Sequence, residues 1–142
     1  MKHIISVICF MIFSLVGSSQ TITKAAIYRS TNQKISISEF AGGAIIFYYQ
    51  NPDYTHIVDL LHFGVQNKTE ALALMDECLH VLSMEKTGQD QHIYHNYKFH
   101  QIIRYGFNQN SVIIGRLYLN AKTIEEIKLA LLNYSYSSIK NQ

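Results

Sequence analysis

The stretch YKFHQIIRYGFNQNSVIIGRLYLNAKTIEEIKLALLNY, residues 97–134, changes its hydrophobic pattern part of the way along. Residues 97–107 and 111–119 are rich in Ile, Tyr and Phe, which are residue types that favour β-strands. The three polar residues between these runs, 108–110, are compatible with a hairpin loop. The first part of the stretch therefore predicts an antiparallel hairpin.

The second part of the stretch, residues 121–134, has the spacing of an amphipathic helix. Its apolar side chains recur at intervals of three and four: Ile124, Ile127, Leu131 and Tyr134. Thr123 and Glu126 have the spacing of a capping box, in which the two side chains bond backbone N–H groups at the helix start. The unit that this stretch predicts is a hairpin followed by a helix.

The same order occurs earlier in the chain. Residues 44–63 contain two β-rich runs on either side of the turn sequence NPDY, so they predict a hairpin with a four-residue loop. Residues 67–84 then predict a helix, with Asn67 and Glu70 as its capping pair. The apolar stripe of this helix is Leu72, Met75, Leu79 and Leu82.

Two more strands are expected before these units. Residues 34–40, KISISEF, alternate Ile with Ser as a half-buried strand does, and residues 25–31 supply a partner strand. The prediction is an α+β fold: an antiparallel sheet built from hairpins, two helices packed on one face, and a possible ββα-ββα pseudo-duplication. Residues 135–142 are polar, and we expect them to fray.

The first nineteen residues have the layout of a signal peptide. Lys2 precedes a mostly apolar run over residues 4–16, and small residues follow at 17–19. We expect cleavage after Ser19, a single domain over residues 20–142, and export to the periplasm or the medium. The alternative is an uncleaved anchor, which would hold the domain at a membrane.

Charge and cysteine content exclude some classes of protein. Without Lys2 the chain carries 11 basic and 10 acidic side chains, so it lacks the basic excess of a nucleic-acid-binding protein. Cys78 is the only cysteine in residues 20–142, so no internal disulfide is expected. Cys78 shares a helical stripe with Leu74 and Met75, and we expect it to be a buried, unreactive thiol.

Three histidines lie close together in HIYHNYKFH, residues 92–100. If this segment is one strand, His92 and His100 lie roughly 26 Å apart and His95 points to the opposite face. A metal site would then need ligands from another strand, such as His56 or His62. The pattern predicts scattered strand histidines, and no metal or other cofactor is expected.

A candidate binding surface follows from the strand register. The loop at 108–110 pairs Ile102 with Arg116 and Arg104 with Ile114, which makes the two arginines diagonal neighbours able to share a ligand. The face predicted to meet the core carries Phe99, Ile103, Tyr105, Ile113, Leu117 and Leu119. The opposite, open face carries Lys98, His100, Arg104, Arg116 and Tyr118.

The hairpin of residues 44–63 extends this surface if it joins the same sheet. A four-residue loop places five residues on the core face: Ile45, Phe47, Tyr49, Val58 and Leu60. The open face then carries Ile46, Tyr48, Gln50, Thr55 and Asp59, of which Tyr48 and Asp59 complete the candidate site. An ordinary solvated sheet face is the alternative interpretation.

Function is predicted from this surface and from the catalytic motifs that are missing. The sequence has no nucleophile-elbow serine, no glycine-rich phosphate loop and no evident pair of catalytic carboxylates. Tyr and Arg are enriched in protein interfaces, and guanidinium groups bind carboxylates. We expect an exported, non-catalytic binding domain for a protein or acidic ligand. The alternatives are a self-associating subunit that forms a homodimer, or a His-dependent metal-binding or hydrolytic protein.

Overall fold

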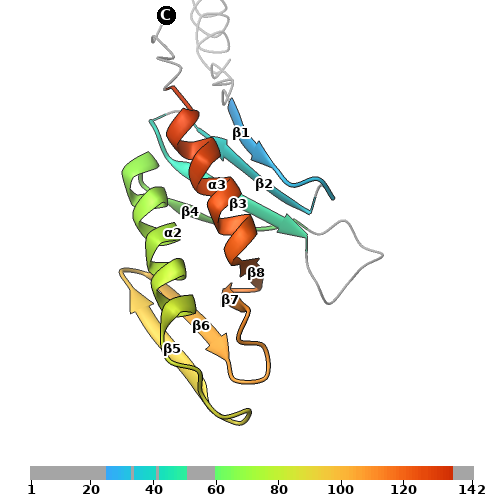
Figure 1. Ribbon diagram of the computed structural model, residues 1–142. Helices are drawn as coiled ribbons and strands as arrows, with labels where there is room; N and C mark the ends of the chain where they lie inside the picture. The colour runs from blue at the N-terminus through green and yellow to red at the C-terminus, as the bar shows by residue number, and fades with distance from the viewer. Residues whose placement is uncertain (1–24, 33, 41, 51–59, 136–142) are drawn as a thin grey trace, which may run out of the picture.

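The computed structural model describes residues 25–32, 34–40, 42–50 and 60–135 (Figure 1). The described part of the first half forms a four-stranded antiparallel sheet in chain order: β1 (Ala25–Arg29), β2 (Ile35–Glu39), β3 (Ile45–Gln50) and β4 (Leu60–Val65). Helix α2 (Lys68–Ser83) follows. The second half repeats the order with β5 (His92–Tyr97), β6 (His100–Tyr105), β7 (Ser111–Ile114), β8 (Leu117–Asn120) and helix α3 (Ala121–Asn133).

The α+β class is confirmed, and so is the repeated order of strands and helix. The strands nevertheless form two sheets, β1–β4 and β5–β8, where one sheet was expected. The reason is that residues 92–120 contain two tight turns more than predicted, so the second half has four short strands that pair with one another. Each half therefore consists of two hairpins and a helix.

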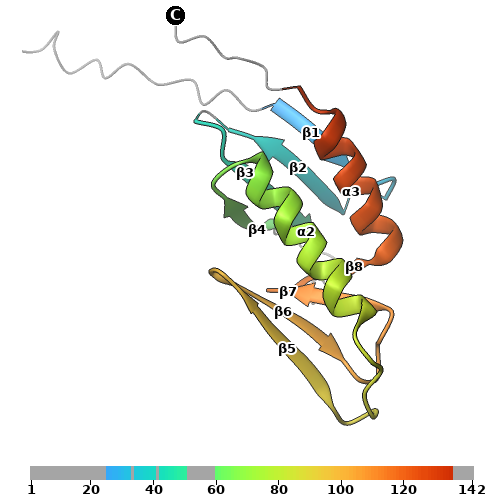
Figure 2. The same ribbon diagram turned by 60° about the vertical axis from the view of Figure 1, so that its left-hand side comes forward.

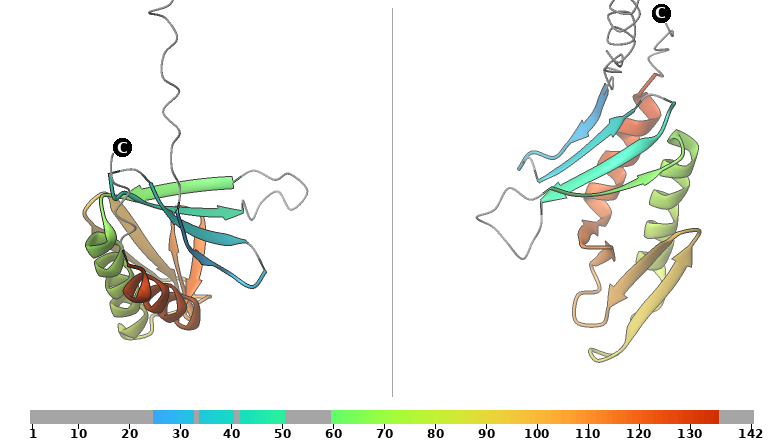
Figure 3. Two further views of the ribbon diagram at one scale, coloured as in Figure 1. Left: turned by 90° about the horizontal axis from the view of Figure 1, so that it is seen from above. Right: turned by 180° about the vertical axis from the view of Figure 1, so that it is seen from behind.

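Both helices lie side by side on one side of the molecule (Figures 1 and 2). Seen from behind, the first sheet lies above the β5–β6 hairpin, and α2 runs past both (Figure 3). The helices are joined by an ion pair between Lys128 and Asp76, 2.8 Å long, and by the Lys68 ammonium, which donates to the Tyr134 carbonyl oxygen at 2.7 Å. The helix pair thus connects the two sheets.

One hydrophobic core is shared by both sheets and both helices. Its fully buried side chains include Phe47 from the first sheet, Ile102 from the second, Leu74 from α2 and Ile127 from α3. Cys78 is also completely buried, as expected, and burial raises the pKa of its thiol to about 12. Because every element contributes to one core, the described residues form a single packed unit.

The cap of α2 is confirmed and that of α3 is wrong. The Asn67 carboxamide accepts from the Glu70 backbone N–H at 2.9 Å. Helix α3 begins three residues earlier than the Thr123–Glu126 capping box implied, because Asn120 is its N-cap and accepts from the Thr123 N–H at 2.9 Å. Asn is a strong N-cap residue, and β8 delivers it directly to the helix start.

The stripe of α2 is also displaced from the predicted one. The buried residues are Ala71, Leu74, Met75, Cys78 and Val81. The predicted residues Leu72, Leu79 and Leu82 are partly buried against this core. More than one stripe of α2 is covered, because the helix contacts β4, β5, β6 and β7 as well as α3.

Two unpredicted turns change the register of the second half. Residues 92–100 are not one strand, because the chain reverses at Lys98 and Phe99 and pairs Tyr97 with His100. Residues 111–119 reverse at Gly115, whose φ of +61° suits the first position of a two-residue turn, so that Ile114 pairs with Leu117. As a result Ile102 pairs with Ile114, where pairing with Arg116 was expected.

The first hairpin is also offset from the expected register. Ile45 pairs with Val65 and Gln50 with Leu60, so β4 begins at Leu60 and the loop is longer than four residues. The core face of β3 is as predicted, with Ile45, Phe47 and Tyr49 buried. Thr55, Val58 and Asp59 lie outside the described residues.

Candidate functional site

Arg104 does not lie on an open face. Its side chain is 1% exposed, because β6 directs both Arg104 and Ile102 into the core. The guanidinium donates to the carbonyl oxygens of Leu82, Met84 and Glu85, at 3.0, 2.9 and 2.6 Å. Arg104 therefore satisfies the carbonyls at and just after the C-terminal end of α2. Its predicted place beside Arg116 on one ligand-binding face is wrong.

Because Arg104 faces the core, the predicted face assignment of β6 is inverted. Phe99, expected in the core, is 94% exposed, and Ile103 and Tyr105 are only half-buried. In β8 the assignment holds, with Leu117 and Leu119 buried and Tyr118 51% exposed. In β7 it is inverted by the turn at Gly115: Val112 and Ile114 belong to the core, whereas Ile113 pairs with Tyr118 on the other face.

Four of the remaining predicted site residues fall into two groups, and Tyr48 lies apart from both. Arg116 and Tyr118 lie at the β7–β8 turn, where they line a cavity with Lys34 of the β1–β2 connection. Lys98 and His100 lie at the tip of the β5–β6 hairpin, beside the edge of the first sheet. Tyr48 lies on β3 near the His62 ring of β4, with 5.9 Å between the ring centroids. The structure does not bring these two groups onto one face.

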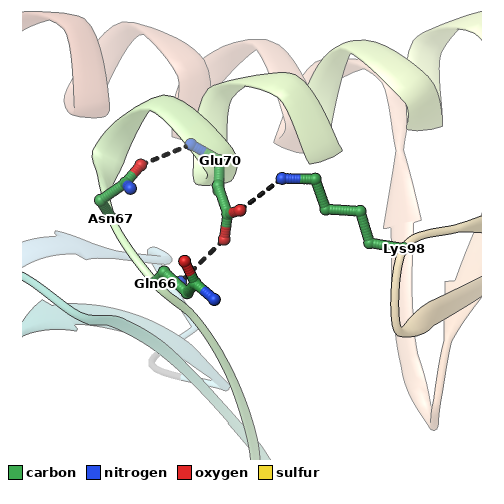
Figure 4. A network of polar contacts seen from close by, with 4 residues as sticks. All are labelled: Gln66, Asn67, Glu70 and Lys98. Atoms are coloured by element: carbon green, nitrogen blue, oxygen red, sulfur yellow. Dashed lines mark hydrogen bonds and ion pairs between the residues drawn. The ribbon is translucent and has the colours of Figure 1, made fainter.

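The hairpin tip is held by a polar network that starts at α2 (Figure 4). The Glu70 carboxylate pairs with the Lys98 ammonium and accepts from the Gln66 backbone N–H at 3.0 Å. This pairing lowers the pKa of Glu70 and raises the pKa of Lys98. Lys98 has a φ of +51°, which is uncommon for a residue with a side chain. The ion pair thus fixes the tip beside the start of α2.

Phe99 follows Lys98 at this tip, and sequence reasoning did not identify it as a site residue. It is the most exposed large hydrophobic side chain of the described residues, at 94%. The sequence signal for a turn was weak here, because neither Lys98 nor Phe99 is a Gly or Asn, the residues that commonly mark a turn. A Phe read as part of a strand is assigned to the core by default.

Two adjoining hollows meet at Phe99 and His100. The first, about 300 Å³, lies between the β3–β4 pair and the hairpin tip, and the second, about 420 Å³, lies between β4 and the β6–β7 region. We call them together the inter-sheet groove, which is lined by these residues: Ala44, Ile46, Tyr49, His62, Phe63, Gly64, Val65, Gln66, Glu70, Tyr97, Lys98, Phe99, His100, Gln101, Ile103, Ile114 and Gly115. Its size is that of an ordinary ligand pocket.

The first hollow of the inter-sheet groove has mainly apolar walls, and the second has polar and apolar walls in similar measure. The ring centroids of Phe63 and His100 are 5.2 Å apart, so these side chains form contiguous surface across the two sheets. Burial lowers the pKa of His100, with the charge of Glu70 opposing that shift. His100 is therefore a neutral imidazole at pH 7, able to donate one hydrogen bond and accept another.

Strand β4 borders the inter-sheet groove and is an edge strand of the first sheet. It pairs with β3 on one side, and the β5–β6 tip lies near its other side (Figure 2). An edge strand presents backbone N–H and C=O groups that can pair with another extended chain. The groove therefore combines apolar walls with a sheet edge.

The described residues include a histidine–carboxylate pair but no cluster of metal ligands. Among the described residues no group of three or more His, Cys, Asp and Glu side chains could hold a metal ion. His95 bonds Glu77 at 2.9 Å, and its ring lies 6.0 Å from that of His80, where β5 packs on α2.

No helix in the described ranges is long and apolar enough to cross a membrane.

No protein-family model matches this chain, and neither a curated protein nor a solved structure is similar to it.

Proposed function

We propose that this protein is an exported, non-catalytic binding protein that takes an extended, apolar segment of another protein into the inter-sheet groove. The observation that carries the proposal is Phe99, which is 94% exposed on a hairpin tip fixed beside the groove. Aromatic residues at the centre of an interface contribute a large share of binding energy. Export rests on the signal-peptide pattern of residues 1–19.

Preorganisation of Phe99 supports this function. The Lys98–Glu70 ion pair and the Asn67 cap hold the tip and the start of α2 together, so Phe99 is presented from a fixed turn (Figure 4). A turn whose backbone is held before binding loses less conformational entropy when a partner covers it. Phe99 lines both hollows of the inter-sheet groove, so it belongs to a contiguous surface that includes apolar wall residues, and this favours an anchor over a single solvated side chain.

The chemistry of the groove supports an extended occupant. The edge of β4 offers backbone groups along one wall, and a peptide that pairs with it points alternate side chains toward the sheet's core side. The two hollows lie along this wall and would take apolar side chains of that peptide. The neutral His100 would supply a polar contact between them.

Selection from a random peptide library on the purified protein tests the proposal. We expect enrichment of peptides that alternate apolar or aromatic residues with polar ones. Phe99→Ser should weaken their binding at least tenfold, because burial of a Phe side chain is worth about 1.5–3 kcal/mol. Phe107→Ser is the matched control, since Phe107 is also exposed, at 66%, but lies beyond the far end of β6.

Two results would count against the proposal. One is a selection without enrichment. The other is a set of peptides that bind wild type, Phe99→Ser and Phe107→Ser equally, which would move the binding site elsewhere. Light scattering on the same samples addresses self-association: a homodimer that Phe99→Ser dissociates would make a second copy the occupant.

A further inference from the structure

The second sheet has an edge strand, β5, whose outer side the proposed function does not use. Strand β5 pairs with β6 on one side only, because the strand order of this sheet is β5-β6-β7-β8. Figures 1 and 2 show β5 as the outermost strand at its end of the molecule, with no other described element beyond it. Its outer edge therefore offers backbone groups to a further strand.

The backbone groups of this edge belong to three residues. In a hairpin with a two-residue turn, the pair that flanks the turn exchanges backbone hydrogen bonds, and every second pair does the same. Here the flanking pair is Tyr97 with His100. The backbone N–H and C=O groups of His92, Tyr94 and Asn96 therefore point away from β6. Among the described residues, none of the backbone hydrogen bonds outside the helices and strand ladders involves these three.

Strand β5 lacks the features that protect other edge strands from pairing. Strand β1 has a bulge between Ala26 and Tyr28 and ends on Arg29, and β8 is only four residues long. Strand β5 is six residues long, pairs with β6 in one continuous register and contains no Asp, Glu, Lys or Arg. Charges, bulges and short length are the usual means that keep an edge from pairing. The edge of β5 is thus open to another strand.

The sequence of β5 suits pairing with itself. A twofold axis at Tyr94 would set this residue opposite the partner's Tyr94, and His92 opposite the partner's Asn96. This antiparallel register uses the outward backbone groups of all three residues. Because a side chain on the axis meets its own copy, a charge there would face a like charge, whereas two tyrosines form a favourable aromatic pair. Tyr94 is 58% exposed, so it has surface for such a pair to cover.

The charged side chains around β5 do not oppose this arrangement. An antiparallel partner brings the start of one strand beside the end of the other. Asp90 precedes β5, and Lys98, which pairs with Glu70, follows it, so the two ends carry opposite signs. On the face toward α2, the Glu77 carboxylate is already paired with His95 at 2.9 Å. Self-pairing of β5 therefore sets no like charges directly opposite one another.

We propose that this protein forms a twofold-symmetric dimer in which β5 pairs with β5 of a second copy, so that two second sheets join into one continuous sheet. Most soluble homo-oligomers are dimers of this symmetry. None of His92, Tyr94 and Asn96 lines the described part of the inter-sheet groove, so the dimer leaves the groove free. A single strand pair is a small interface, and we expect a dissociation constant in the micromolar range or weaker.

Sedimentation velocity tests the dimer on protein purified after expression of the full chain. The sedimentation coefficient of wild type should rise from that of a monomer toward that of a dimer between about 1 and 500 µM protein. Tyr94→Lys places like charges at the axis, so it should weaken dimerisation at least fivefold. Tyr118→Lys is the matched control, since Tyr118 is also exposed, at 51%, but lies on β8 at the opposite edge of the sheet.

A mixture of two variants tests the twofold pairing itself. Tyr94→Lys and Tyr94→Glu should each dimerise weakly alone, because like charges meet. An equimolar mixture should form a heterodimer, because opposite charges then meet, and added salt should weaken that heterodimer. Phe99→Ser should dimerise like wild type, which separates this interface from the groove. Circular dichroism spectra of the variants confirm that they fold.

Three outcomes would overturn the proposal. Wild type remains a monomer at the highest concentration, or Tyr94→Lys dimerises as wild type does, or the mixture of Tyr94 variants forms no heterodimer. Loss of the dimer in Phe99→Ser but not in Tyr94→Lys would also overturn it, and would place the second copy in the inter-sheet groove. Loss of peptide binding in Phe99→Ser with an intact dimer would support two separate surfaces.

Discussion

Arg104 shows how one residue can invert the interpretation of a strand. An arginine in an alternating pattern is normally assigned to the solvent side, because charged residues are almost never fully buried unless paired. Here the partners are the backbone carbonyls of Leu82, Met84 and Glu85, which belong to a segment about 20 residues away in sequence. No local pattern announces such a partner, so the face of β6 could not be predicted.

Replacing Arg104 by Met should lower the free energy of unfolding by roughly 2–4 kcal/mol. The change removes charge-assisted hydrogen bonds and leaves three carbonyls without their donor. Arg29→Met, at an exposed position of β1, should change it by no more than about 0.5 kcal/mol. Urea unfolding followed by circular dichroism measures both variants. Equal effects of the two substitutions would show that Arg104 is not a structural cap.

His100 should make stability depend on pH in the weakly acidic range. Its pKa in the folded protein is lowered by burial, below the value of 6.5 that it has when unfolded. The unfolded chain therefore binds the proton first, and stability falls as pH decreases through 6.5 toward the lower, folded pKa. Urea midpoints between pH 7.5 and 5.0 should decrease more in wild type than in His100→Gln. Parallel curves would contradict this assignment.

The two helix starts illustrate what sequence predicts well and where it errs by a few residues. Both helices and the core stripe of α3 follow from apolar spacing, and Asn67 was identified as the cap of α2. For α3 the capping-box pattern predicted Thr123 as the N-cap, whereas the N-cap in the structure is Asn120, at the end of β8. Strand β8 extends to Asn120 because Asn120 pairs with Ser111. This pairing depends on the turn at Gly115, which was not predicted.

Asn120→Ala should destabilise the protein by about 1 kcal/mol, since it removes the side chain that accepts from the Thr123 N–H. Thr123→Ala should be neutral or slightly stabilising, because Thr123 lies inside the helix, where Ala has the better propensity. Thermal unfolding of the two variants distinguishes the caps. A larger loss in Thr123→Ala would favour the capping box.

Strand registers were the least predictable elements. The turn at Lys98–Phe99 carries no Gly or Asn, and Gly115 was read as part of a strand. Both turns are stabilised from outside, the first by the Glu70 ion pair and the second by the Tyr49 hydroxyl, which accepts from the Arg116 backbone N–H at 3.4 Å. Tertiary contacts of this kind cannot be seen in a local window of sequence.

At the scale of the whole molecule, the repeated order of two hairpins and a helix explains where the candidate site lies. The first sheet ends at the edge strand β4, and the second half begins with the β5–β6 hairpin, whose tip lies beside that edge (Figure 3). The inter-sheet groove is the space between these two parts. The predicted open face was built from a single sheet, so it included Lys98 and His100 but not the groove around them.

Site-specific photo-cross-linking in cells of the source organism tests the central proposal most directly. Phe99 is replaced by p-benzoylphenylalanine, which keeps an aromatic ring at the hairpin tip, and Phe107 is replaced in the same way as the control. The proposal predicts a discrete cross-linked partner from position 99 that is absent from position 107. If position 99 gives no product, or the two positions give the same products in equal yield, the inter-sheet groove is not the partner-binding site.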